Sequence, residues 1–315
     1  MNVVEVQNLY KTFKVNTSTK FLAKTFKPKF KEVHAVNDIS FNINQGESVA
    51  FLGPNGAGKT TTTKMLTGLI YPSKGSIKVL GYKPQDRTSE FLKSIGLVMG
   101  NKSGLSWDLT SRQTFRLYKD IYEISDIDFE RRLKYLSDIL NVVDFLDIPV
   151  RKLSLGERMK LEMISAILHD PKILFLDEPT IGLDVVSKQN IRKFLKEIQT
   201  TENITILMTS HDMDDIEKVC DRVMVINHGK LIYDDSMDRL KKKYSQEKYV
   251  KIFFNGPTPT LENINIIEKG DSYILIKSLP NLIPSIINSF GTQQLIDDID
   301  IYSEPLEEMF KMILE

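Results

Sequence analysis

The sequence has very little cysteine and no long hydrophobic segment. Cys220 is the single cysteine among 315 residues, so the chain cannot hold an internal disulfide. No run of apolar residues approaches the roughly 18–20 needed for a helix to span a bilayer. The first residues, MNVVEVQNLYK, lack the charged-then-apolar layout of a secretory signal. If this protein works at a membrane, we expect it to do so through a partner.

The sequence also lacks an excess of either charge. Lysine plus arginine and aspartate plus glutamate each number 42, so the formal net charge is +0. Domains that bind nucleic acid usually carry a basic excess, so no nucleic-acid partner is expected. Hydrophobic residues make up 41% and charged residues 27% of the chain, the balance of an ordinary globular protein. At this length we expect a main domain and an appendage.

Glycine is concentrated in one short stretch, GPNGAGKTT, at residues 53–61. The spacing Gly53-x-x-x-x-Gly58-Lys59-Thr60 is the phosphate-loop pattern, in which successive backbone N–H groups form a concave nest for phosphate oxygens. A side chain at the glycine positions would hold the phosphates away from these amides. The stretch therefore predicts a binding site for a nucleoside triphosphate. Its expected members are Gly53, Pro54, Asn55, Gly56, Ala57, Gly58, Lys59, Thr60 and Thr61.

The residues on either side of this stretch fit that prediction. Residues 47–52 form a short, mostly apolar run typical of a buried strand, and residues 61–68 lack proline and favour a helix. The N-terminus of that helix would point the positive end of its dipole at the phosphates. Lys59 would neutralise the β- and γ-phosphates, and the hydroxyl of Thr60 would bind Mg²⁺.

Two further strand-like runs end in polar side chains. Residues 173–178, ILFLDE, are apolar up to Asp177 and Glu178. Because α/β sheets bind ligands at the carboxyl ends of their strands, both acids are expected beside the phosphates. Asp177 would hold Mg²⁺ through a water molecule, and Glu178 would polarise the attacking water as general base. Residues 206–211 end at His211, whose imidazole could hydrogen-bond the γ-phosphate and the attacking water.

Strand-like and helical patterns alternate over most of the chain. This alternation predicts an α/β domain with a parallel sheet, and the helical pattern of about residues 110–170 predicts an insertion. Near residues 241–243 the pattern changes, and residues 246–315 are expected to form a small α+β appendage. Residues 20–31 carry five lysines, no acid and interleaved aromatics. They could contact an anionic membrane surface or a partner, or form a solvated loop.

Residues 151–158, RKLSLGER, resemble the signature motif LSGGQ of ABC-transporter ATPases. In that family the serine and glycine at the start of a helix bind the γ-phosphate held by the opposite subunit. The resemblance gives this role to Ser154, Gly156 and Glu157. Leu155 and Glu157 stand where the family usually has Gly and Gln.

Other positions resemble the remaining motifs of this family, in the same order along residues 1–240. Residues 182–184 resemble the D-loop, which implies a nucleotide contact for Asp184, and His211 resembles the switch histidine. Tyr10 and Phe13 lie where the family stacks an aromatic ring on adenine, with Phe13 the better fit. The family also has a glutamine that contacts Mg²⁺ and senses the membrane partner. This sequence has Asn101 there, one methylene shorter.

The residues around these motifs resemble one subgroup of the family. Residues 98–101 (VMGN), 107–109 (WDL), 149–159 and 177–185 resemble the daunorubicin-resistance type of exporter ATPase, whose permeases are separate chains. The resemblance implies contact with integral membrane permease subunits near residues 101–114. Trp107 could anchor a permease helix there or fill the core.

The expected fold is a P-loop NTPase α/β core with an antiparallel β flank, a helical subdomain at about residues 101–170 and a C-terminal appendage. The resemblance places the nucleotide-binding domain at residues 1–240. Because only one nucleotide-binding unit is present, a second chain, identical or paralogous, would complete a sandwich around two ATP and Mg²⁺. The complex would work at the cytoplasmic face of the cell membrane. The alternatives are a non-transport ABC ATPase acting on ribosomes or DNA, a small-molecule kinase, and an ATP-binding regulator without turnover.

Overall fold

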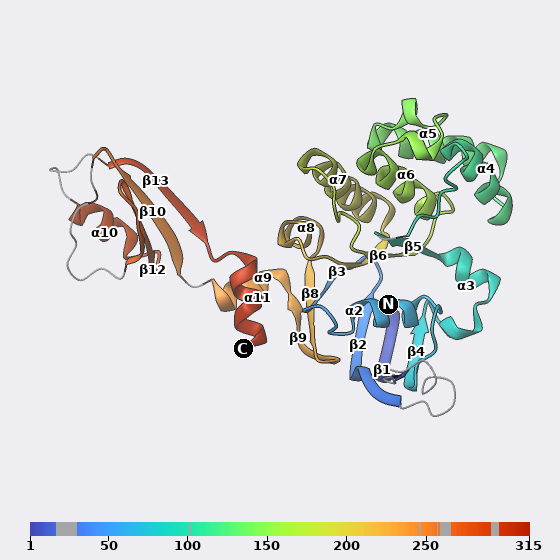
Figure 1. Ribbon diagram of the computed structural model, residues 1–315, viewed down its shortest axis with the longest axis horizontal. Coiled ribbons are helices and arrows are strands. Elements are labelled where there is room, and N and C mark those ends of the chain that lie inside the picture. Colours follow the sequence, from blue (N-terminus) through green and yellow to red (C-terminus); the bar gives the residue numbers. More distant parts are fainter. Residues whose placement is uncertain (17–29, 101, 246, 257, 259–265, 291–295) are drawn as a thin grey trace. The chain divides into compact units, whose positions relative to one another are not determined.

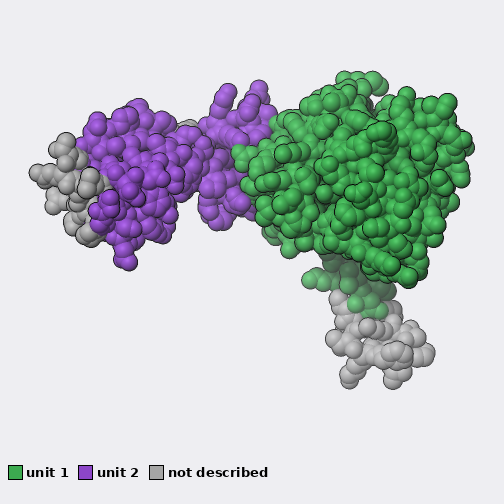
Figure 2. Space-filling model, turned by 90° about the horizontal axis from the view of Figure 1, so that it is seen from above, with its two compact units in different colours: residues 1–235 green, residues 236–315 purple. Residues whose placement is uncertain are grey.

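The computed structural model describes residues 1–16, 30–100, 102–245, 247–256, 258, 266–290 and 296–315. Asn101 and most of the lysine-rich insert lie outside these ranges. The chain forms two compact units, residues 1–235 and 236–315, coloured separately in Figure 2. This division falls five residues before the limit expected at residue 240. The reason is that helix α9 (Met237–Tyr244) packs against helix α11 (Leu306–Leu314) of the second unit.

A six-stranded sheet forms the centre of the first unit (Figure 1). Its strand order is β5-β6-β7-β3-β8-β9, and the neighbouring pairs from β5 to β8 are all parallel. Three of its strands, β3, β6 and β7, are buried along their whole length, as expected when both faces of a sheet are covered. The strands are β3 (Ser48–Leu52), β5 (Ile95–Met99), β6 (Ile173–Asp177), β7 (Thr205–Thr209), β8 (Arg222–Asn227) and β9 (Lys230–Ser236).

A three-stranded antiparallel sheet lies beside this centre and is the expected β flank. Its order is β2-β1-β4, formed by Phe30–Asn44, Asn2–Asn16 and Lys74–Val79. Alternate residues of these strands are buried, so one face of the sheet is apolar. That face shares a single hydrophobic core with β3 and the helix after it; the rings of Phe41 and Phe51, for example, lie 6.0 Å apart.

Helices complete the first unit, and those of the expected helical subdomain gather together in Figure 1. Two of them begin with a reciprocal capping box, which satisfies free N–H groups of the first turn: Thr110 with Gln113, and Ser154 with Glu157. The helices are α2 (Lys59–Leu66), α3 (Ser89–Ser94), α4 (Ser111–Ile121), α5 (Asp126–Leu140), α6 (Leu155–Ile167), α7 (Val185–Glu202) and α8 (Met213–Val219), with short 3-10 turns at Pro84–Asp86, Val143–Phe145 and Val150–Lys152.

The second unit is a small α+β structure. Its four-stranded antiparallel sheet has the order β11-β12-β10-β13 and packs buried side chains such as Val250, Ile252 and Phe254 against Phe290 and neighbouring apolar residues. Across the described ranges of the whole chain, no helix is long and apolar enough to cross a membrane. The remaining elements of this unit are β10 (Lys248–Phe254), β11 (Ile266–Lys269), β12 (Tyr273–Ser278), α10 (Ile283–Ser289) and β13 (Ile296–Ser303).

Candidate nucleotide site

The glycine-rich loop runs from the end of β3 to the first residue of α2. Gly53, Gly56 and Gly58 have φ angles of +156°, +80° and +113°, which side chains rarely adopt. A Cβ atom on Gly53 would lie 2.2 Å from the carbonyl oxygen of Ile226, and one on Gly58 would lie 2.4 Å from that of Ala35. Neighbouring backbone therefore excludes any larger residue at these two positions.

Lys59, the first residue of α2, is held by the loop that precedes it. Its ammonium group donates hydrogen bonds to the carbonyl oxygens of Gly53, at 2.6 Å, and Pro54, at 3.2 Å. Burial lowers the pKa of Lys59, while the carboxylates of Glu178 and Asp177 act in the opposite direction. Lys59 therefore lies close enough to the loop carbonyls for hydrogen bonds and close enough to Asp177 and Glu178 for their charges to act on it.

The parallel register of the sheet brings Asp177 next to the start of α2. Asp177 ends β6 and pairs with Thr209, which ends β7. Its Oδ1 atom accepts hydrogen bonds from the Thr60 hydroxyl, at 3.1 Å, and from the Thr209 hydroxyl, at 2.7 Å. A hydroxyl and a carboxylate in contact, both hard oxygen donors, fit a Mg²⁺ ion that takes its other ligands from phosphates and water.

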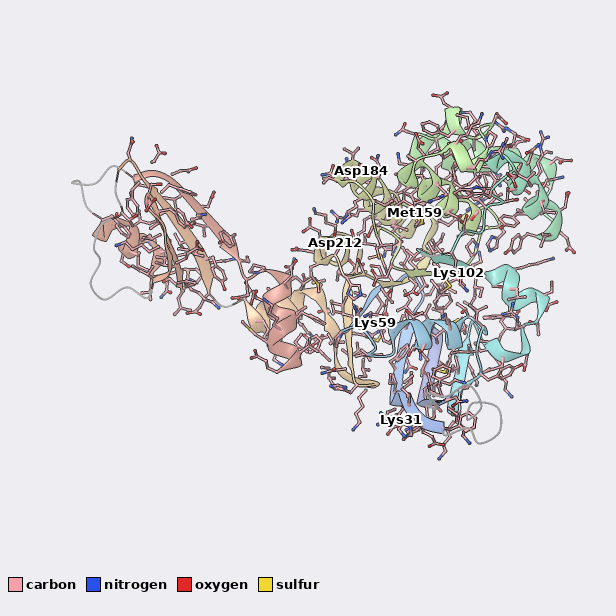
Figure 3. The ribbon with its side chains drawn as sticks, viewed as in Figure 1. Lys31, Lys59, Lys102, Met159, Asp184 and Asp212 are labelled. Atoms are coloured by element: carbon pink, nitrogen blue, oxygen red, sulfur yellow. The ribbon has the colours of Figure 1, made fainter. Side chains whose placement is uncertain are left out.

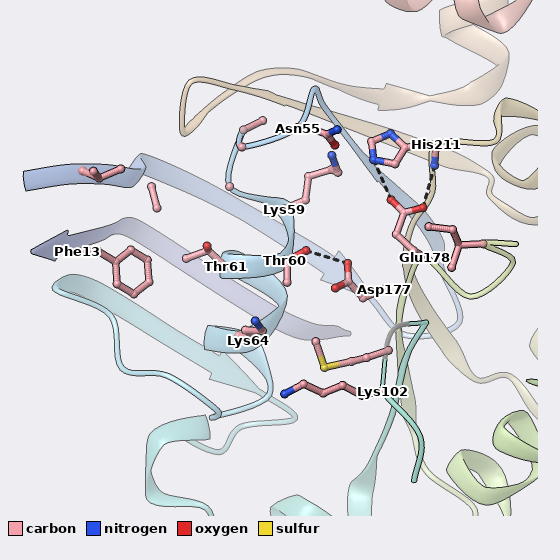
Figure 4. A pocket seen from close by; sticks show the side chains of 17 residues that line it. Phe13, Asn55, Lys59, Thr60, Thr61, Lys64, Lys102, Asp177, Glu178 and His211 are labelled. Carbon is pink, nitrogen blue, oxygen red and sulfur yellow. Dashed lines mark hydrogen bonds and ion pairs between the residues drawn. The ribbon is translucent and has the colours of Figure 1, made fainter. Parts of the chain in front are cut away.

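Glu178 and His211 face each other at the same edge of the sheet (Figure 4). The Glu178 carboxylate accepts a hydrogen bond from the His211 backbone N–H at 3.2 Å, and its Oε1 lies 3.3 Å from His211 Nε2. Glu178 has a φ of +56°, a left-handed conformation unusual for a residue with a side chain. Burial raises the pKa of Glu178 above its ordinary value, and His211 opposes this rise. A raised pKa makes a carboxylate a stronger base.

These residues line one cavity of about 540 Å³. The loop residues Asn55–Thr61 form part of its wall, with Asp177, Glu178 and His211 on the same cavity. Phe13 also lines it, and Figure 4 places the ring well away from Glu178 and His211. Tyr10 is not among the lining residues. A long ligand with an aromatic group at one end and phosphates at the other fits this arrangement.

The residues that resemble the signature motif and the D-loop do not line this cavity. Ser154 accepts a hydrogen bond from the N–H of Glu157 at 3.3 Å, and Glu157 accepts one from the N–H of Ser154 at 2.8 Å. Asp184 caps α7 by accepting the N–H of Ser187 at 2.9 Å. Figure 3 shows Asp184 at the start of α7, away from Lys59.

The signature residues and the D-loop residue are neighbours of each other. A Cβ atom on Gly156 would lie 2.3 Å from Ser187 Oγ and 3.4 Å from Asp184 Oδ2. The structure therefore brings the predicted residues together in two groups, one around the cavity and one at the adjoining starts of α6 and α7.

Two buried residues were missed by the sequence reasoning. Thr209 joins Asp177 to the backbone of Glu178. Its signal was a hydroxyl residue at the carboxyl end of a strand-like run, two residues before His211. Glu162, in α6, is 6% exposed and accepts N–H bonds from Gly104 at 3.0 Å and Leu105 at 3.3 Å, together with the Ser103 hydroxyl. An acid within the apolar run of residues 161–164 was the signal there.

Trp107 does not fill the core, which corrects one of its two expected roles. Its side chain is 54% exposed. The guanidinium of Arg158, in α6, lies 5.2 Å from the centre of its ring. A ring that is covered by a guanidinium on one side and open to solvent elsewhere belongs to the surface of the helical region.

Comparison with known proteins identifies the family. The model of the ABC transporter family matches residues 36–181. The ABC transporter ATP-binding protein NatA of Bacillus subtilis is 34% identical over 233 residues, which are 74% of this chain and 94% of that protein. The bacitracin transport ATP-binding protein BcrA of Bacillus licheniformis is 34% identical over 220 residues, 69% of each chain.

Solved structures agree with this assignment at the level of the fold. An ATP-binding cassette solved as a dimer in a post-hydrolysis state, bound to ADP and Pi, superimposes with a TM-score of 0.63 at 22% identity, over 74% of this chain and 98% of that one. The fold expected from the sequence, a P-loop NTPase of the ABC type, is thereby confirmed. The chain belongs to the family of ABC transporter ATP-binding proteins and is an ATPase.

Proposed function

We propose that this chain is the ATP-hydrolysing subunit of an ABC exporter. It pairs with a second ATPase chain around two ATP and Mg²⁺ and drives a separate membrane permease. The observation that carries the proposal is the separation of the two groups of residues: the cavity holds the phosphate loop, Asp177, Glu178 and His211, while Ser154 and its neighbours lie outside it.

Within one chain, the cavity residues divide the work on ATP. Phe13 stacks on adenine, the amides of residues 53–61 receive the phosphates, and Lys59 neutralises them. Thr60 and Asp177 would hold Mg²⁺, with Asn101 as a further ligand by resemblance to the family, and the ion would neutralise charge on the β- and γ-phosphates. Glu178 accepts the proton of the attacking water, and His211, in contact with Glu178, orients that water against the γ-phosphate.

The second group of residues serves the nucleotide of the opposite chain. Ser154, Gly156 and Glu157, at the N-terminus of α6, and Asp184, at the N-terminus of α7, form a surface that can approach a γ-phosphate from outside. Exposed apolar side chains of Leu155, Ile181, Val185 and Val186 lie beside them in the sequence, at 39%, 54%, 71% and 65% exposure. Apolar exposure next to anion-binding helix starts supports association with another chain there.

A permease partner and the export direction of transport are supported by a relative and by the resemblance to one subgroup. One relative is named for bacitracin transport, and the subgroup that the sequence resembles consists of exporter ATPases with separate permeases. The chain would therefore sit at the cytoplasmic face of the cell membrane, with residues near Trp107 to Thr114 facing the permease. ATP-driven closing and opening of the pair shifts the permease between its states.

A mixing experiment tests the shared site. Lys59→Ala removes the phosphate-binding lysine of a chain's own cavity. Ser154→Ala removes the signature serine that this chain contributes to the site of its partner. In a mixed pair, one composite site has both defects and the other has none. We expect two inactive proteins to regain about a quarter of the wild-type ATPase rate when mixed, since random pairing of a two-fold dimer gives half mixed pairs with one intact site each.

The matched control mixes Lys59→Ala with the double variant Lys59→Ala/Ser154→Ala, in which no pairing restores a site. Recovery in this control, or no recovery in the mixture of Lys59→Ala with Ser154→Ala, would contradict the two-chain site.

A further inference from the structure

We propose that Thr209 is a positioning residue that orients Asp177 for Mg²⁺ and holds the backbone of Glu178. Thr209 ends β7, next to β6 in the sheet, and its side chain is buried at 1% exposure. The inference rests on the proposed role of the cavity as an ATP–Mg²⁺ site.

One hydroxyl group makes both contacts. Thr209 Oγ1 donates to Asp177 Oδ1 at 2.7 Å and accepts the N–H of Glu178 at 3.2 Å. Because it donates its single proton to Asp177, the hydroxyl can only accept from Glu178, so both partners fix its orientation. The Glu178 N–H also reaches the carbonyl oxygen of Thr209 at 3.1 Å.

These bonds set which oxygen of Asp177 is free. Oδ1 receives the hydroxyls of both Thr60 and Thr209. Among the contacts of the described residues, Oδ2 accepts no hydrogen bond, and Asp177 lines the cavity. Without Thr209 the carboxylate could rotate about its χ2 torsion, which is broad for aspartate. A fixed carboxylate binds a cation better because no orientation has to be selected on binding.

The same hydroxyl supports the left-handed backbone of Glu178, whose φ is +56°. Such a conformation persists only where surrounding contacts hold it. Glu178 and Asp177 are adjacent in sequence. A single side chain of the neighbouring strand therefore fixes both the carboxylate of the metal ligand and the backbone of the general base.

The test is Thr209→Val, which keeps the β-branched shape and removes the hydroxyl. The chain is titrated with a fluorescent, non-hydrolysable ATP analogue, once in EDTA and once in saturating Mg²⁺. The ratio of the two dissociation constants gives the enhancement by Mg²⁺. We expect Thr209→Val to reduce this enhancement by about tenfold or more, the usual effect of losing a partner of a metal ligand. Affinity in EDTA should stay within about twofold, since Lys59 and the loop amides are untouched.

Two further variants distinguish a positioning role of the Thr209 hydroxyl from a general effect of the substitution on folding. Thr209→Ser restores the hydroxyl and should restore the enhancement. Thr205→Val makes the same substitution at the other end of β7, where a buried hydroxyl accepts the N–H of Gly46 at 2.9 Å. It should leave the enhancement as in the wild type whatever it does to the melting temperature.

The outcomes also separate this inference from the proposed function. A Thr209→Val chain with wild-type enhancement, a Thr209→Ser chain that behaves like Thr209→Val, or an equal loss in Thr205→Val would overturn the role of Thr209. So would a wild-type chain that binds the analogue without any enhancement by Mg²⁺. Failure of the wild-type chain to bind the analogue at all, or binding that persists in Lys59→Ala, would overturn the ATP site itself.

Discussion

The two groups of nucleotide-related residues in the first unit are held by different kinds of contact. Around the cavity, bonds join residues far apart in sequence: Thr60 to Asp177 across 117 positions, and Thr209 to Asp177 across 32. Around Ser154 and Asp184, the side chains bond residues three positions away, within their own helix starts.

On the proposed function, this difference separates residues that act within one chain from residues that act only across a pair of chains. The cavity residues already contact each other across the sheet, so we expect a single chain to bind a nucleotide. Ser154 and Asp184 accept hydrogen bonds from groups three residues along the chain, and on the proposed function they act when a nucleotide of another chain approaches. Loss of a phosphate or adenine contact in the cavity should therefore weaken nucleotide binding by a single chain, whereas changes at the signature surface should leave that binding unchanged and lower hydrolysis by the assembled pair.

The largest effect is expected from Glu178→Gln. The amide cannot take the proton of the attacking water, so ATP hydrolysis should fall by about 10²–10⁴-fold. ATP binding should survive, and size-exclusion chromatography should detect pairs of chains that persist in ATP. A variant that hydrolyses ATP at the wild-type rate would sink the assignment of the base.

Ser154→Ala should have the next largest effect on ATP hydrolysis. It is also the most direct test of the difference between the cavity and the signature surface. Loss of one hydrogen-bond donor to the transferred phosphate typically lowers turnover by about 10²-fold. Nucleotide binding by the dilute single chain should be unchanged, and loss of the N-cap should cost about 1 kcal/mol of stability. Binding by titration and hydrolysis at high protein concentration are measured side by side. If Ser154→Ala weakened binding by the single chain, the two regions would not be separate.

The pH dependence of hydrolysis should reveal the buried base. Burial raises the pKa of Glu178 above its ordinary value of 4.5. The active, charged form is thus present above the raised pKa and is lost as the pH falls through it. We expect the rate to drop about tenfold per pH unit below that point, with the midpoint above 4.5. Titration of an ATP analogue at each pH distinguishes lost hydrolysis from lost binding, and a midpoint at or below the ordinary value would refute the raised pKa.

The smallest effect is expected from Phe13→Ala. Stacking of a base on an aromatic ring contributes about 1–3 kcal/mol, so ATP affinity should fall by about fivefold or more. Tyr10→Ala is the control, because Tyr10 lies near Phe13 on β1 but does not line the cavity. Measured by nucleotide titration, equal losses in both variants would mean that Phe13 has no special contact with adenine.

The sequence by itself determined the features that depend on short spacings. The glycine loop was predicted because three glycines, a lysine and a threonine stand at fixed positions. Phe13, which lines the cavity, was preferred over Tyr10 by resemblance to family members. The predicted helix after the loop started at residue 61, whereas α2 begins at Lys59, since helix ends are poorly defined by apolar patterns.

Only the tertiary structure decided which further side chains support the predicted site residues. Thr209 contacts Asp177 because β7 lies beside β6 in parallel register, and no local pattern specifies the order of strands. Glu162 receives the N–H groups of Gly104 and Leu105 only through the fold, because these residues lie 58 and 57 positions away in the sequence. Short-range hydrogen bonds follow from sequence spacing, whereas long-range bonds depend on how the whole chain packs. For this reason the motifs could be predicted and the residues that support them could not.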